Sequence, residues 1–190
     1  MFEELVLKNR SYRGFDRSVL VTRERMLRWL GCVRTSPSAR NLQMLKFKPV
    51  TDADACSRLL ALTRWGGALP QMHLPPEGHE PTAFLVVCAD LKLGTCSENT
   101  MIDVGIAAQT FLLAATEDGF GGCMLRNFSH DGVHDLLGLS EWLSPQLVIG
   151  LGKPAEVAKV VDLPESGSVN YYRENGIHCV PKRSLDELVI

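Results

Sequence analysis

Apolar residues recur along the chain with two periods, so the pattern predicts both helices and strands. Spacings of three and four residues, as in Met26, Leu30 and Val33, are typical of an amphipathic helix. Small polar residues such as Thr22 and Ser97 stand where a side-chain oxygen can cap a first turn. The predicted helices are residues 2–8, a segment that follows Thr22 and breaks at residues 35–38, a segment that follows Asp52, residues 97–117, and a segment from Ser129 to Gly138.

Short apolar runs predict the strands. Residues 83–89 read AFLVVCA without polar alternation, which is typical of a strand buried on both faces. Residues 45–50, 123–125 and 144–151 are the other predicted strands. Because helices and strands are interspersed without a regular βαβ rhythm, the pattern favours an α+β fold. The length of 190 residues fits a single domain that spans residues 1–190.

The helix at residues 97–117 is the most distinctive element. Its apolar residues run around nearly the whole circumference, and small residues such as Gly105 would let a neighbour approach closely. A helix that is apolar on all sides is buried. We therefore expect this helix to be either the centre of the core or the seam of a dimer.

The segment at residues 66–81 is rich in Gly and Pro and predicts an irregular loop. It is either a lid over a site or a plain surface connection.

Composition narrows the class of protein. Hydrophobic residues make up 45% of the chain and charged residues 22%, as in a globular protein, and the net charge of −2 favours neither nucleic acid nor an anionic membrane as a partner. No apolar run approaches the roughly 20 residues of a membrane helix, and no secretory signal is visible. The six Cys form no CxxC pair, so we expect a reducing, cytoplasmic environment.

Several common motifs are missing from the sequence. It has no GxGxxG and no GxxxxGK[ST], the two frequent phosphate-binding loops. His130 and His134 have the spacing of two metal ligands on a helix, but no third ligand accompanies them. We therefore expect no metal site.

Three short polar clusters remain. The first cluster, NRSYRGF at residues 9–15, has two Arg with a Ser between them and can bind a phosphate or a polarised carbonyl. The second cluster, SPSARNLQ at residues 36–43, places hydroxyl and amide donors at an expected helix start, where free N–H groups favour anions. The third cluster, PKR at residues 181–183, is cationic. Each alone is typical of a solvated surface patch.

Together, the three clusters resemble the nitroreductase family in order and spacing, from residue 2 to residue 190. The first is similar to the family's opening signature, and the second to its Pro-Ser-Ser/Ala-x-Asn-x-Gln signature. DVGIAAQTFLLAATEDGFGGCML resembles the family's central helix and the Gly-rich turn after it. VIGLGKPAE resembles its strand and turn, and VPKRSLDELV its basic C-terminal motif.

The resemblance implies a nitroreductase-like fold, in which helices wrap a central and mostly antiparallel sheet. It implies a homodimer along the central helices, with FMN shared at the interface and a C-terminal extension that crosses to the partner. The implied enzyme is an oxidoreductase that passes electrons through FMN, from NADH or NADPH to a small acceptor such as a nitro compound or a quinone.

The resemblance also implies which residues bind FMN. Arg10, Ser11 and Arg13 contact the FMN of their own subunit, and Arg13 lies near the pyrimidine edge of the flavin. Lys182 and Arg183 neutralise its phosphate.

Other implied contacts come from the middle of the chain. Pro37, Ser38 and Asn41 reach the flavin of the other subunit, and Gln43 supports their loop. The residues implied beside flavin N5, through their backbone N–H groups, are Leu125, Arg126 and Asn127.

Two positions depart from the family's pattern. Asn9 replaces the usual first Arg, which weakens one phosphate or ribityl contact. Arg126 and Asn127 stand where many members have Gly or Glu-Gly. The Arg126 side chain either faces the pocket, where it favours an anionic substrate, or points away from it.

Two further functions fit the same pattern. One is a specialised reaction on another small ring substrate, and the other is a non-catalytic role in flavin binding or redox sensing. The sequence assigns no catalytic side chain, because the hydride chemistry belongs to FMN.

Overall fold

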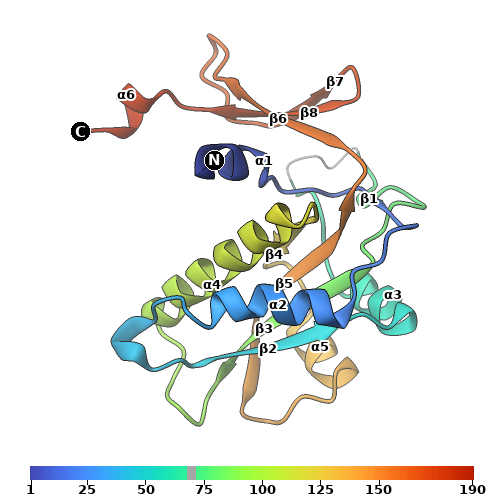
Figure 1. Cartoon of the computed structure of the whole chain (residues 1–190), viewed down its shortest axis with the longest axis vertical. Helices are drawn as coiled ribbons and strands as arrows, with labels where there is room; N and C mark the ends of the chain where they lie inside the picture. The colour runs from blue at the N-terminus through green and yellow to red at the C-terminus, as the bar shows by residue number, and fades with distance from the viewer. Residues whose placement is uncertain (68–71) are drawn as a thin grey trace.

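The structure is a computed structural model that describes residues 1–67 and 72–190 (Figure 1). Its helices are α1 (Phe2–Lys8), α2 (Arg23–Val33), α3 (Ala53–Ala61), α4 (Glu98–Glu117), α5 (His130–Leu136) and α6 (Leu185–Leu188), with a short 3-10 helix η1 (Ala39–Asn41). Its strands are β1 (Phe15–Asp16), β2 (Leu45–Val50), β3 (Ala83–Asp90), β4 (Gly121–Leu125), β5 (Leu143–Pro154), β6 (Val157–Asp162), β7 (Tyr172–Glu174) and β8 (Ile177–Lys182).

The main sheet has five strands and is antiparallel throughout. Its order is β1-β5-β3-β2, and β4 also pairs with β5. Every residue of β3 is buried, as the unbroken apolar run predicts. The structure therefore confirms the predicted α+β class, with its mostly antiparallel central sheet.

Two hydrophobic cores cover the two faces of this sheet. Alternate residues of β3 point to opposite faces, so Leu85 packs with α2 and α4 while Phe84 packs with α3 and α5. Trp29 of α2 meets Phe111 of α4 edge-on, with ring centroids 5.6 Å apart. The side chains of Thr22, Asp52, Ser97 and Ser129 accept hydrogen bonds from backbone N–H groups of the first turns, which confirms the predicted helix starts.

Helix α4 belongs to the core along part of its surface, and the expected dimer seam stays a prediction. Only one side of it, which includes Val104, Ala108 and Phe111, is buried within this chain. Ile102 on the other side is 59% exposed, and Gly105 is exposed as well. Only one stripe of the apolar circumference therefore packs into the core. The other stripe is exposed to solvent in a single copy of the chain.

The C-terminal sheet, in the order β6-β8-β7, was not predicted from the sequence. Strand β8 pairs parallel with β6 and antiparallel with β7. Its strands lack a clear apolar period, and Val157 and Val160 of β6 are exposed. In Figure 1 this sheet lies apart from the main body, with α1 between the two.

Part of the predicted loop at residues 66–81 lies outside the described residues, at 68–71. Beyond that gap, Leu74 and Pro75 are buried. In the part of the chain that is described, no helix is both long and apolar enough to cross a membrane.

Candidate functional site

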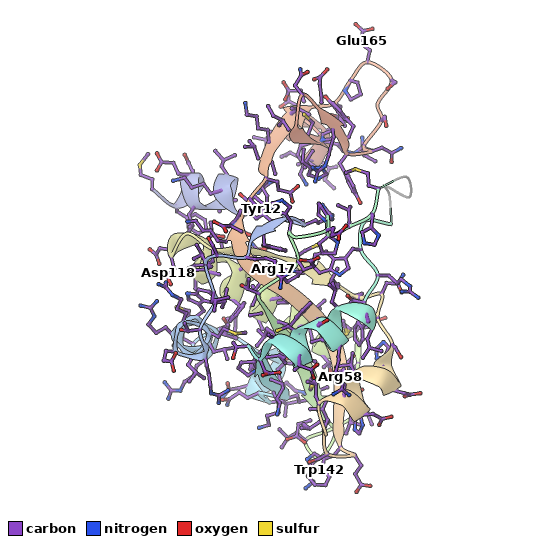
Figure 2. The ribbon with its side chains drawn as sticks, turned by 90° about the vertical axis from the view of Figure 1, so that its right-hand side faces the viewer. Tyr12, Arg17, Arg58, Asp118, Trp142 and Glu165 are labelled. Carbon is purple, nitrogen blue, oxygen red and sulfur yellow. The ribbon has the colours of Figure 1, made fainter. Side chains whose placement is uncertain are left out.

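The first cluster lies along the edge of β4. Ser11 forms a β-bridge with Gly122, and the backbone N–H of Tyr12 donates to the Gly122 carbonyl at 3.1 Å. A side chain at Gly121 would begin 2.5 Å from the Tyr12 ring, so only glycine admits this close approach. The Gly-rich turn of the sequence thus serves to seat the first cluster. Figure 2 shows Tyr12 where the C-terminal sheet meets the body.

Arg10 is half-buried beside the end of α1. Its Nη2 donates to the carbonyl of Val6 at 2.6 Å, which satisfies a free carbonyl of that helix end. Its Nε is buried and has no hydrogen-bond partner in the described chain. One edge of the guanidinium therefore lacks an acceptor.

Arg13 is held by the C-terminal part of its own chain. Its Nη1 donates to the Ser11 carbonyl at 3.2 Å and lies 3.4 Å from Nε2 of His178. Its guanidinium carbon lies 5.0 Å from the centre of the Tyr171 ring, in a cation–π contact. As in Arg10, its Nε is buried without a partner among the described residues.

Glu156 joins the first cluster to the C-terminal sheet. Its carboxylate accepts hydrogen bonds from the backbone N–H groups of Arg13 and Gly14, and it forms an ion pair with Arg173 of β7. The Glu156 side chain is only 7% exposed, so solvent screens this pair weakly. Sequence reasoning missed its role, although a single acid after the turn at Pro154 was a visible signal.

Burial and nearby charges shift the pKa values of two ionisable groups at this site. Burial lowers the pKa of His178, and the cation of Arg13 lowers it further. Burial raises the pKa of the Cys123 thiol, which keeps it protonated; Arg13 and Ser11 act in the opposite direction, and Glu156 adds to the rise. The first cluster therefore faces neutral groups on β4 and β8.

The second cluster forms a compact, largely exposed loop around η1. The Ser38 hydroxyl accepts from the Gln43 backbone N–H at 3.2 Å, and Gln43 Nε2 donates to the Asn41 carbonyl at 3.3 Å. Arg40 and Asn41 adopt left-handed backbone conformations, with φ of 51° and 54°. Pro37 and Asn41 are exposed, and Ser38 is half-buried.

Asp103 anchors this loop to α4, a role that sequence reasoning did not find. Its Oδ1 accepts from the Ala39 backbone N–H at 2.9 Å, and the residue is 6% exposed. Asp103 also lines two cavities beside the loop, of about 370 and 350 Å³. A lone acid within an apolar helix pattern was the available signal.

The segment after β4 is split between core and surface. Leu125 is buried, whereas Arg126 and Asn127 are exposed. The Arg64 backbone N–H donates to the Asn127 carbonyl at 2.9 Å. This contact fixes the backbone next to Arg126.

The third cluster ends β8. Lys182 and Arg183 are both exposed, and Arg183 forms a surface ion pair with Glu187 of α6 at 3.2 Å. Such exposed pairs contribute little stability, so Arg183 remains free to bind another anion.

The first and second clusters lie toward opposite ends of α4. The second is bonded to Asp103 near its beginning, and the first is seated on Gly122, just after its end (Figure 1). The helical rise from Asp103 to Glu117 alone is about 20 Å. The structure thus brings the first cluster together with the C-terminal sheet, and it keeps the second cluster away from both.

Comparisons with known proteins agree with this architecture. Residues 97–153, which carry α4, β4, α5 and most of β5, match the Nitroreductase family model. A nitroreductase family protein from Streptococcus pneumoniae TIGR4 superposes with a TM-score of 0.71 at 19% identity, over 100% of this chain and 99% of that one.

Two further solved structures share the fold. An FMN-dependent nitroreductase from Clostridium difficile R20291 has a TM-score of 0.65 at 23% identity, over 80% of this chain and 88% of that one. A protein from Exiguobacterium sibiricum 255-15, solved in complex with FMN, has a TM-score of 0.69 at 17% identity, over 82% and 89%. The chain therefore has the nitroreductase fold, and its resemblance to the nitroreductase family is confirmed.

Proposed function

We propose that the protein is an FMN-dependent oxidoreductase that passes electrons from NADH or NADPH to a small acceptor, such as a nitro compound or a quinone. The observation that carries this proposal is a set of buried nitrogen atoms around the first cluster that have no hydrogen-bond partner among residues 1–67 and 72–190. They belong to Arg10, Arg13, Arg173 and His178. A buried donor without an acceptor costs about 1–3 kcal/mol, so this region is suited to an acceptor-rich ligand.

FMN fits this set of donors. Its phosphate is an anion, for which Arg10, Lys182 and Arg183 supply positive charge on one chain. Ser11, next to Arg10 in the chain, is exposed and can donate to a phosphate or ribityl oxygen. When bound, FMN supplies the hydride chemistry, and the protein supplies binding and orientation.

Arg13 has a separate task in this proposal. It holds a fixed positive charge beside the pyrimidine edge of the flavin, where negative charge grows on reduction. The backbone of Leu125, Arg126 and Asn127 would hold flavin N5, and the hydrogen bond from the Arg64 N–H to the Asn127 carbonyl braces it.

The complete site needs a second copy of the chain. The second cluster is remote from the first within one chain, whereas the exposed stripe of α4 offers an apolar seam for a partner. In the proposed homodimer, Pro37, Ser38 and Asn41 of one copy complete the flavin site on the first cluster of the other. Ile102 and Gly105 lie on this seam.

The proposed donor and acceptor follow the proteins that share the fold. One of them is called an FMN-dependent nitroreductase, and another, from Staphylococcus epidermidis, an NAD(P)H:FMN oxidoreductase. We place the protein in the cytoplasm, since its six cysteines are free in the structure.

An absorbance spectrum of the purified protein tests the proposal. We expect yellow protein, and heat should release a flavin that co-migrates with FMN in chromatography. Colourless protein that takes up no added FMN would contradict the flavin site. Flavin-loaded protein that fails to oxidise NADH or NADPH with any quinone or nitro acceptor would point to flavin binding without catalysis.

A further inference from the structure

The C-terminal sheet contacts the first cluster through side chains that the family resemblance gives no part in flavin binding. Tyr171, just before β7, meets His178 of β8 edge-on, with ring centroids 5.1 Å apart. Both rings contact the guanidinium of Arg13. His178 is only 3% exposed, so its contacts are made inside the protein.

These contacts fix the orientation of the Arg13 guanidinium. The guanidinium carbon lies 5.0 Å from the centre of the Tyr171 ring, and His178 together with the Ser11 carbonyl holds Nη1. The opposite edge, formed by Nε and Nη2, makes no hydrogen bond in the described chain. Such an edge carries two parallel N–H groups, the geometry that binds two acceptor atoms at once.

The chemistry of the His178 ring follows from its neighbour. Arginine has no acceptor, so Nε2 of His178 must accept from Arg13, and a neutral ring then carries its proton on Nδ1. The charged groups that act on the ring are Arg13, Glu156 and Arg173, and burial together with the two arginines lowers its pKa. The ring is therefore neutral at pH 7 and able to accept.

Glu156 links the backbone of the first cluster to the C-terminal sheet. It binds the backbone of Arg13 and Gly14 and also pairs with Arg173, which stands opposite His178 in the β7–β8 ladder. The sheet that carries His178 is thus tied to the backbone that carries Arg13.

We propose that His178, with Tyr171, is a positioning residue that directs the free edge of Arg13 toward the flavin. The proposal rests on the proposed function, because it takes the ligand at that edge to be FMN. It deepens that function by assigning the C-terminal sheet of the same chain a part in orienting the flavin-binding cation.

Titration of full-length apoprotein with FMN tests the proposal. His178→Leu should raise the dissociation constant about 3- to 10-fold, a smaller loss than in Arg13→Ala, since the cation stays and loses only one of the hydrogen bonds that orient it. His178→Gln keeps an acceptor near Nε2 and should stay within about 2-fold of the wild type. The midpoint potential of bound FMN should fall in His178→Leu and recover in His178→Gln, because a displaced cation stabilises reduced flavin less well.

A double-mutant cycle separates positioning from general stability. In the Arg13→Ala background, His178→Leu should add nothing to the loss of affinity, because His178 acts through Arg13. Tyr171→Phe retains the ring and should match the wild type, whereas Tyr171→Leu should weaken FMN binding even if His178→Leu fails to fold. Additive effects, or wild-type affinity in both Leu variants, would overturn the proposal. A wild-type protein without FMN affinity would instead overturn the proposed function.

Discussion

The first and second clusters of the chain differ in how far a single copy completes them. The first is enclosed by its own chain, with Arg13 held between Ser11, His178 and Tyr171. The second is exposed, and its polar groups form hydrogen bonds within its own loop and with Asp103. The first cluster has buried donors that lack an acceptor in the described chain. The second cluster is an exposed loop whose shape is held by its own hydrogen bonds.

This difference reflects two separate proposed tasks, which are anion binding and contact with another subunit. The sequence signatures alone do not distinguish them. Cations that hold an anion need partial burial, since charges in contact with water are screened. In the proposed homodimer, the loop that contacts the other subunit must remain exposed until the subunits meet. The left-handed residues at Arg40 and Asn41 and the bond to Asp103 keep its shape fixed before that contact.

The largest effect is expected from blocking the α4 seam. An added Cβ meets no atom within 4 Å at Gly105 or at Gly31, so each chain tolerates a large residue there. Gly105→Trp should convert a dimer of about twice 21.0 kDa into a monomer and abolish tight FMN binding. Gly31→Trp on α2 is the matched control and should remain dimeric. Light scattering at micromolar concentration measures both, and a dimeric Gly105→Trp protein would place the seam elsewhere.

Removal of a cation from the first cluster should have the next largest effect. Arg10→Ala and Arg13→Ala each remove a charge-assisted bond of roughly 1.5–3 kcal/mol, so the dissociation constant for FMN should rise about 10-fold or more. Arg17→Ala is the control, since Arg17 forms an exposed ion pair with Glu80. Flavin fluorescence measures the affinities. Unchanged dissociation constants for FMN in all three variants would show that the first cluster is only a solvated surface patch.

The smallest effect is expected at Arg126. If its side chain faces the pocket, Arg126→Ala should lower kcat/KM on a carboxylated nitroaromatic more than on its uncharged analogue. The difference in transition-state stabilisation should be about 1–3 kcal/mol. FMN binding and turnover of a neutral quinone should persist, because the backbone carries that contact. Equal losses on both nitroaromatics would show that the exposed Arg126 does not select for charge.

The sequence predicted helices α1 to α5 and strands β2 to β5, because apolar periods and capping residues act over short distances. The C-terminal sheet escaped prediction, since β6 and β7 are largely exposed and the partly buried β8 mixes polar with apolar residues. Glu156, His178 and Asp103 escaped for a different reason. Each acts on a residue more than 60 positions away, so a local pattern can mark such a residue but cannot identify its partner.

A mixed dimer tests the shared site most directly. One chain carries Arg10→Ala and Arg13→Ala, and the other carries Asn41→Asp, which keeps a residue type that tolerates the left-handed backbone at φ 54°. If the two clusters meet across the interface, the purified heterodimer has one site with both clusters intact. It should bind one FMN per two chains with wild-type affinity, while both mutant homodimers bind weakly. A heterodimer that binds no better than its parents would show that each flavin site draws both clusters from one chain.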